Sequence, residues 1–126
     1  MTFESMLQTI VDECGGGFSA ALMGLDGVAV AQVVAQAGRD RDDPLGGDAT
    51  FAGIEFGRIL GDMTKASDAL DAGPLRESVI SLARLQLVFH TVDEELFLVL
   101  ALRPDGNLGK ARYLIRRSLP AIRAAL

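Results

Sequence analysis

Cysteine, histidine and excess positive charge are all scarce in this chain. Its 126 residues include one cysteine, Cys14, which excludes an internal disulfide and a metal cluster made of cysteine alone. The sequence does not open with a charged start followed by a long apolar region, so we expect no secretion signal. We therefore expect a cytoplasmic protein.

Positive charge is outweighed by negative charge. Lysine and arginine together number 12, against 17 aspartates and glutamates, which gives a formal net charge of −5 and a pI of about 4.7. Binding to phosphate backbones or to anionic membranes depends on an excess of lysine and arginine. We therefore expect protein partners, with no nucleic acid and no membrane insertion.

Few residues in the sequence suit catalysis. The only histidine, His90, lies in an alternating stretch that is typical of a strand at the surface of a sheet. Cys14 ends a helical pattern, where a packing role is favoured over that of a nucleophile without a nearby base. A group of aspartates lacks calcium-loop spacing, so a solvated loop is favoured for Asp40, Asp42, Asp43 and Asp48. We expect no catalytic residue, no metal and no cofactor.

A strand, a turn and a helix near the end of the chain invite comparison with a nucleotide-binding loop. The apolar run Leu96 to Leu102 is too short to cross a bilayer, and it stops at a turn before a helical pattern. Gly109-Lys110 matches the end of a phosphate-binding loop. However, Pro104 replaces the first glycine and offers no N–H, and Ala111 replaces the hydroxyl that binds Mg²⁺. A turn with Asn107 capping a helix is favoured.

Hydrophobic periodicity predicts a single domain over residues 1–126. Helical spacing covers residues 3 to 14, 51 to 70 and 108 to 126. Strand-like patterns cover residues 18 to 24, 28 to 34, 76 to 82, 85 to 92 and 96 to 102. Asp26-Gly27 between the first two strands predicts a two-residue hairpin turn with positive φ. Short connections make the sheet antiparallel, so the fold class is α+β with helices covering the sheet.

The second helical segment carries an apolar face and a stripe of glycines. The apolar face consists of Phe56, Ile59, Leu60, Met63, Ala66 and Leu70. Gly53, Gly57 and Gly61 form a slowly turning stripe beside it. Each glycine inside a helix costs about 1 kcal/mol relative to alanine, so three of them predict a close approach by another backbone. That backbone belongs either to the domain's own sheet or to the same helix of a second subunit.

The third helical segment predicts a buried stripe with a basic border. Its apolar residues are Leu108, Ala111, Ile115, Leu119, Ile122 and Leu126. Lys110 and Arg117 flank one side of the stripe, and Arg112, Arg116 and Arg123 flank the other. A solvated border over the core is favoured over a site for an acidic partner.

Together these elements resemble the roadblock, or dynein light chain, family. The resemblance rests on Ala20-Ala21-Leu22-Met23-Gly24-Leu25-Asp26-Gly27 in the first hairpin and on Ala66-Ser67-Asp68-Ala69-Leu70 in the second helix. The ending Phe97-Leu-Val-Leu-Ala-Leu, Asp105-Gly-Asn, Leu108-Gly-Lys-Ala-Arg-Tyr is similar to the bacterial MglB and MglC branch, and most similar to MglC. The resemblance covers nearly the whole chain.

The resemblance implies an α-β-β-α-β-β-β-α roadblock-like fold with a five-stranded antiparallel sheet, and a homodimer without a catalytic centre. The family's sheets join edge to edge and the second helices pack together. Members regulate or connect Ras-like GTPases, and bacterial ones often work with an MglA-type GTPase in cell polarity and motility. An adaptor that binds polarity proteins such as an MglB-like paralogue is preferred here. Direct GTPase activation of the MglB type is the alternative, and an enzyme or nucleotide-binding protein is the third hypothesis.

Two interfaces are predicted. A free strand edge exposes unpaired backbone groups, so we expect the homodimer to use the second helix and the strand from Arg76 to Leu82. The interface residues are Gly53, Gly57, Gly61, Leu60, Val79 and Ser81. A partner protein is expected at the hairpin tip, where Leu25 is not needed for turn geometry. There Leu25 and Val28 supply apolar burial, and Asp26 supplies a charged contact with a basic group.

Overall fold

The computed structural model describes residues 2–126 and shows three helices and five strands in that part of the chain. The helices are α1 (Phe3–Glu13), α2 (Thr50–Ala69) and α3 (Leu108–Ala124). The strands are β1 (Gly17–Gly24), β2 (Ala29–Val34), β3 (Glu77–Ser81), β4 (Gln86–Thr91) and β5 (Leu96–Leu102). The predicted order of elements is confirmed, and no bound differs from the predicted one by more than two residues.

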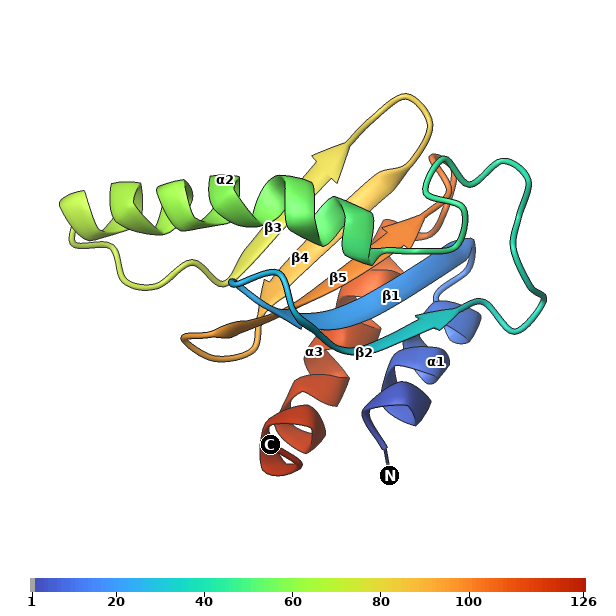
Figure 1. Ribbon diagram of the computed structural model, residues 1–126, viewed down its shortest axis with the longest axis horizontal. Helices are drawn as coiled ribbons and strands as arrows, with labels where there is room; N and C mark the ends of the chain where they lie inside the picture. Colours follow the sequence, from blue (N-terminus) through green and yellow to red (C-terminus); the bar gives the residue numbers. More distant parts are fainter. Residues whose placement is uncertain (1) are drawn as a thin grey trace.

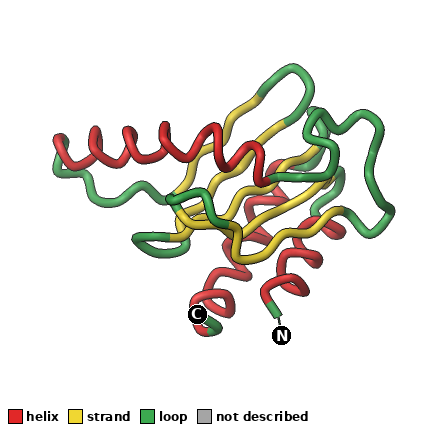
Figure 2. The backbone as a smooth tube through the Cα atoms, viewed as in Figure 1, coloured by secondary structure: helices red, strands yellow, loops and turns green. Residues whose placement is uncertain are grey.

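The strands form one antiparallel sheet in the order β2-β1-β5-β4-β3. Figures 1 and 2 show α1 and α3 on one face of this sheet and α2 alone on the other. The predicted α+β class and the five-stranded antiparallel sheet are therefore confirmed. Because β5 is central and both of its faces are covered, its sequence is a continuous apolar run instead of an alternating one.

Each face of the sheet has its own hydrophobic core. Under α1 and α3, Leu98 and Leu100 of β5 pack with Ile10 and Ile115. Under α2, the alternate residues of the same strand join a second cluster that includes Met23, Phe89, Phe97 and Val99. The period of two along β5 thus divides its side chains between the two cores.

The hairpin between β1 and β2 differs from the predicted two-residue turn. The Gly27 N–H donates to the Gly24 carbonyl at 3.0 Å, and the Gly24 N–H donates to the Val28 carbonyl at 2.9 Å. Gly27 has φ of +89°, whereas Asp26 is not among the positive-φ residues. The loop is therefore a three-residue turn in which glycine alone occupies the left-handed region, and the prediction of positive φ at Asp26 was wrong.

The predicted apolar face of α2 is also only partly buried. Leu60 is buried and Phe56 is half-buried, but Ile59, Met63 and Leu70 are exposed. The residues that α2 does bury are Ala52, Gly53, Gly57 and Leu60. Figure 1 shows that the second half of α2 extends past the sheet and that no other helix lies on this face of the sheet. Much of the apolar face is therefore uncovered in the single chain.

On α3 the predicted buried stripe is largely confirmed. Ala111, Ile115, Leu119 and Ile122 are buried as expected. Leu114 is buried as well, although the stripe drawn from the sequence omitted it. The last residue, Leu126, was expected to be buried and is exposed, because the helix ends at Ala124.

Candidate interaction surfaces

The strand β3 forms an edge of the sheet, as expected, since it pairs only with β4. The Thr91 N–H donates to the Arg76 carbonyl and the Leu82 N–H donates to the Leu85 carbonyl, each at 2.9 Å. In an antiparallel ladder, the residues whose backbone groups face the neighbouring strand alternate with those whose groups face away. The outward-facing backbone groups of β3 are therefore those of Glu77, Val79 and Ser81.

The opposite edge, β2, is partly closed. The side chain of Gln8 on α1 donates to the Val34 carbonyl at 2.8 Å, and the Gln36 N–H donates to the Asp12 carboxylate at 2.8 Å. The β1–β2 register is also shifted by a bulge between Leu22 and Met23. Bulges and covering side chains are devices that protect an edge from pairing with another strand. By contrast, β3 pairs with β4 without a shift in register, and its edge is the more open of the two.

The three glycines of α2 occupy different environments. A Cβ on Gly53 would overlap the sulfur of Met23, a fully buried residue of β1. Gly53 thus allows α2 to approach its own sheet, which was one of the two alternatives. A Cβ on Gly57 or Gly61 would meet no atom within 4 Å. Leu60 also packs into the core under α2. Gly57 is itself buried, although an added Cβ would meet no atom, whereas Gly61 is half-buried and borders open space.

We expect the substitution Gly53→Leu to lower the free energy of unfolding by about 2–3 kcal/mol, because overpacking a filled core forces neighbours out of place. The matched substitution Gly61→Leu should change it by less than about 1 kcal/mol, since the added side chain enters open space. Urea denaturation at two protein concentrations measures both values and separates effects on folding from effects on association. Equal losses for the two variants would contradict the assigned environments.

The hairpin tip is exposed, as the partner-binding prediction requires. Leu25 is 51% exposed and Val28 is 62% exposed. The Leu25 N–H donates to the Glu95 carbonyl at 2.9 Å, which fixes the tip to the turn between β4 and β5. The Asp26 carboxylate accepts a hydrogen bond from the Val28 N–H at 3.0 Å, so Asp26 also has a role within the turn. A hollow of about 450 Å³ at the tip is lined by Leu25, Asp26, Val28, Val30, Glu94, Glu95 and Leu96, among others.

The residues considered for catalysis lie apart from one another. Cys14 is buried at the end of α1, and this burial raises the pKa of its thiol. His90 lies on β4, where its Nδ1 is 3.1 Å from the Thr91 carbonyl oxygen. Asp40 and Asp42 form ion pairs with Arg103 at 2.8 and 3.8 Å. Across the described residues, no group of three or more His, Cys, Asp or Glu side chains is placed to hold a metal ion.

The turn before α3 has the capped geometry expected from its sequence. The Asn107 side chain accepts a hydrogen bond from the Lys110 N–H at 3.0 Å, and the Asn107 N–H donates to the Gly15 carbonyl at 2.9 Å. The side chain of Gln86 donates to the Pro104 carbonyl at 3.1 Å. The backbone N–H groups of Asn107 and Lys110, which a phosphate group would use, are therefore already bound within the protein. The capping prediction for Asn107 is confirmed.

A carboxylate on β3 organises the basic border of α3. Glu77 is bound by Arg112, with one contact at 3.2 Å, and by Arg116 at 3.0 Å. Its side chain is only 14% exposed. Hydrogen bonding by Arg112, and then by Arg116, holds the pKa of Glu77 below its ordinary value. Two arginines of the border are therefore used to attach the edge strand to α3.

The lowered pKa of Glu77 predicts a pH-dependent stability. We expect Glu77→Gln to lower the free energy of unfolding at pH 7 by about 1–2 kcal/mol. The stabilisation is fully present above the ordinary pKa of a glutamate and is lost as the pH falls below about 4. In acid, the wild type and Glu77→Gln should therefore have the same free energy of unfolding. Glu13→Gln is the control, since Glu13 is exposed and lies 4.0 Å from its partner Arg117. Urea denaturation between pH 3 and 7 tests this, and a constant difference across the range would contradict it.

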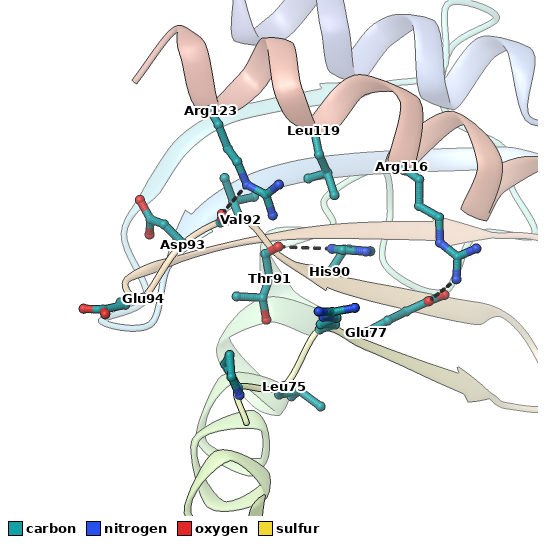
Figure 3. Close-up of a pocket in the computed structure, with 12 residues that line it drawn as sticks. Leu75, Glu77, His90, Thr91, Val92, Asp93, Glu94, Arg116, Leu119 and Arg123 are labelled. Atoms are coloured by element: carbon teal, nitrogen blue, oxygen red, sulfur yellow. Dashed lines mark hydrogen bonds and ion pairs between the residues drawn. The ribbon is translucent and has the colours of Figure 1, made fainter. Parts of the chain in front are cut away.

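Beside this cluster lies a cavity of about 640 Å³ between α3 and the β3–β4 strands (Figure 3). Its apolar lining includes Leu75, Val92 and Leu119. Its polar lining includes Arg116 and Arg123 from α3 and His90 from β4. Figure 3 shows Leu119 between the two arginines, on the side of α3 that faces β4.

Sequence reasoning missed Glu77 and this cavity. Arg112 and Arg116 lie four residues apart and therefore share one face of α3, which was a signal for a common acidic partner. The partner is 35 residues away in sequence from Arg112, and spacing on the helix does not say which strand lies beneath it. The spatial neighbours follow only from the order of strands in the sheet.

The single chain thus has one open sheet edge, an exposed apolar hairpin and an uncovered helix face. No helix in residues 2–126 combines the length and hydropathy needed for a membrane span. The element order and sheet are those of roadblock domains.

Three solved structures are similar to this chain over most or all of its length. The chain is similar to MglC from Myxococcus xanthus, with 30% identity, a TM-score of 0.69 and complete coverage of both chains. A roadblock/LC7 domain from Streptomyces avermitilis matches with 15% identity and a TM-score of 0.80, over 99% of this chain and 98% of that one. The gliding protein MglB from Thermus thermophilus matches with 19% identity and a TM-score of 0.78, over 95% and 84%. The last two show the fold alone.

The chain belongs to the roadblock family, within its MglB and MglC-like branch. The resemblance recognised in the sequence is thereby confirmed. No protein-family model and no curated protein sequence matches the chain.

Proposed function

We propose that this protein is a non-catalytic, cytoplasmic homodimer that acts as an adaptor in the polarity and motility system of a Ras-like, MglA-type GTPase. The observation that carries the proposal is the full-length similarity to MglC at 30% identity. The open edge of β3 and the exposed hairpin tip support it, because each offers a surface for another protein.

In the proposed dimer, β3 pairs with β3 of the second copy. The outward-facing groups of Glu77, Val79 and Ser81 are symmetric about Val79, so a two-fold axis there pairs Val79 with itself and Glu77 with Ser81. Val79 is 39% exposed and Ser81 is exposed, so both are free for this contact in the single chain. This pairing satisfies the backbone groups that the edge leaves open.

The helix α2 supplies the second part of the proposed dimer interface. Ile59 and Met63, on the part of the helix beyond Gly57, and Leu70, directly after its end, are exposed apolar residues. Contact with α2 of a second copy removes this apolar surface from water, which stabilises the dimer by about 25 cal/mol for each Å² of apolar surface that is buried. An added Cβ on Gly57 or Gly61 would meet no atom, so these positions leave space for α2 of the second copy. Gly53 and Leu60 instead pack against the protomer's own sheet and hold α2 in position.

For the adaptor role, the proposed partner is an MglB-like paralogue or another polarity protein, bound at the hairpin tip. Leu25 and Val28 provide the apolar part of the contact, and Asp26 provides a charge for a basic group on the partner. Direct contact with the GTPase is the alternative role, in which the protein itself activates hydrolysis.

A GTP hydrolysis assay separates these roles. The MglA-type GTPase of the same organism is measured alone, with this protein, with its MglB-like paralogue, and with both. The adaptor role predicts that this protein alone leaves the hydrolysis rate unchanged, while it binds the paralogue in the same buffer. A tenfold or larger acceleration by this protein alone assigns direct activation instead.

A further inference from the structure

The cavity between α3 and the β3–β4 strands is lined by basic, acidic and apolar side chains. We propose that it binds an acidic, partly apolar segment of a partner protein, with Arg116 and Arg123 holding a carboxylate of that segment. Glu94 is the one lining residue that this cavity shares with the hollow at the hairpin tip, and the other residues of the cavity lie outside the proposed adaptor contact.

The two arginines are held in place before any partner arrives. The Nε of Arg123 donates to the Val92 carbonyl at 2.8 Å, and a terminal nitrogen of Arg116 donates to Glu77 at 3.0 Å. A guanidinium has five N–H donors, so each arginine keeps donors for a further acceptor. Figure 3 shows both side chains reaching from α3 toward the strands on either side of Leu119. Positioned guanidinium groups favour binding of a carboxylate because less side-chain freedom is lost.

The cavity lining carries three arginines, Arg76, Arg116 and Arg123, and three carboxylates, Glu77, Asp93 and Glu94, and Arg112 adds a further positive charge beside Glu77. Glu77 is thus already matched by two arginines, Arg112 and Arg116. The Asp93 carboxylate accepts hydrogen bonds from the Glu95 and Leu96 N–H groups, both at 2.8 Å, and is used within its turn. Figure 3 shows Asp93 and Glu94 at the far side of the cavity from Arg116.

The apolar lining and the overall charge indicate the class of ligand. Leu75, Val92 and Leu119 form a surface suited to an apolar side chain next to the bound carboxylate. The protein as a whole has a net charge of −5, which opposes binding of a polyanion such as nucleic acid or an anionic membrane. A short protein segment with one carboxylate and an apolar side chain beside it fits the apolar lining and carries too little negative charge to be strongly repelled.

The test uses a blocked hexapeptide in which a single glutamate is flanked by two leucines and the other positions are glycine, titrated into the ¹⁵N-labelled full chain and followed by NMR. The expected result is saturable binding with shifts centred on His90, Thr91 and the side chains of Arg116 and Arg123. Substituting glutamine for glutamate in the peptide should weaken binding at least tenfold. The protein variants Arg116→Gln and Arg123→Gln should each bind the glutamate peptide at least tenfold more weakly than the wild type does. Arg112 still binds Glu77 in Arg116→Gln, and a thermal melt confirms that each variant is folded.

Arg117→Gln is the matched control, because Arg117 lies on the same helix but outside the cavity lining. It should bind the peptide as the wild type does. The proposal is overturned if no saturable binding is seen up to millimolar peptide, if the Arg117 variant loses as much affinity as the other two, or if the shifts lie elsewhere. Binding of inorganic phosphate with the same arginine dependence, without binding of the peptide, also overturns it and assigns a site for small anions.

Discussion

The substitution Val79→Pro is expected to convert the proposed homodimer into a folded monomer. The Val79 N–H faces away from β4, so proline there leaves the β3–β4 ladder intact and removes only the outward donor. Both copies carry the change, so the dimer loses two hydrogen bonds of about 1–1.5 kcal/mol each. This loss raises the dissociation constant of the dimer about 30- to 150-fold. Analytical ultracentrifugation across a dilution series measures it.

Val79→Thr is the control for the effect of the side chain. Threonine is β-branched and keeps the backbone N–H, so this variant should remain a dimer at concentrations where Val79→Pro is monomeric. Circular dichroism should show the same secondary structure in all three proteins. If Val79→Pro stays as dimeric as the wild type, β3 does not form the interface.

The double substitution Leu25→Ala with Asp26→Asn is expected to weaken binding of an MglB-like partner by about 100-fold or more. Loss of an exposed apolar anchor and of a charge at the centre of a contact each removes about 1–2 kcal/mol or more. Asparagine is chosen at position 26 because its side-chain oxygen can still accept from the Val28 N–H and maintain the turn. Isothermal titration calorimetry with the purified paralogue measures the affinity.

The control substitution for the hairpin is made at the other end of the sheet. Leu82 is also an exposed apolar residue, near the turn between β3 and β4, and Leu82→Ala should leave affinity for the paralogue unchanged. The double variant should keep the wild-type dimer mass and melt within about 2 °C of it, since surface changes rarely alter stability by more than 0.5 kcal/mol. Unchanged affinity in the double variant would exclude the hairpin as the partner site.

Most of the fold was predictable from local patterns. The seven apolar residues of β5 indicate a strand buried on both faces, and β5 is the central strand. Asp-Gly marked the first hairpin, although the number of residues in the turn was wrong because Gly27 alone adopts positive φ. Periodicity reports which residues are apolar and at what spacing, and this is sufficient to place elements along the chain.

The surfaces were harder to predict, because they depend on what lies next to each element. Ile59 and Leu70 share an apolar stripe with Leu60, yet only Leu60 has the sheet beneath it. Gly53 and Gly61 look equivalent in sequence, but one contacts Met23 and the other borders open space. The Glu77 cluster joins residues from two elements more than 30 positions apart. Helix periodicity alone cannot distinguish a face that meets the protomer's own sheet from one left for another protein.

In the proposed dimer, Val79 of one copy lies opposite Val79 of the other, so a disulfide between the two copies can report this pairing. Directly opposed residues of this kind have Cα atoms about 5.5 Å apart, which is within the range for a disulfide. The native Cys14 is buried and should not compete.

Mild oxidation of Val79→Cys should therefore give a covalent species of twice the 13.3 kDa chain mass on a non-reducing gel. Ile80→Cys is the control, because in this register residue 80 lies opposite residue 78 and not opposite itself. We expect efficient cross-linking of Val79→Cys and little of Ile80→Cys. A Val79→Cys protein that stays monomeric after oxidation, or an Ile80→Cys protein that cross-links equally well, would contradict it.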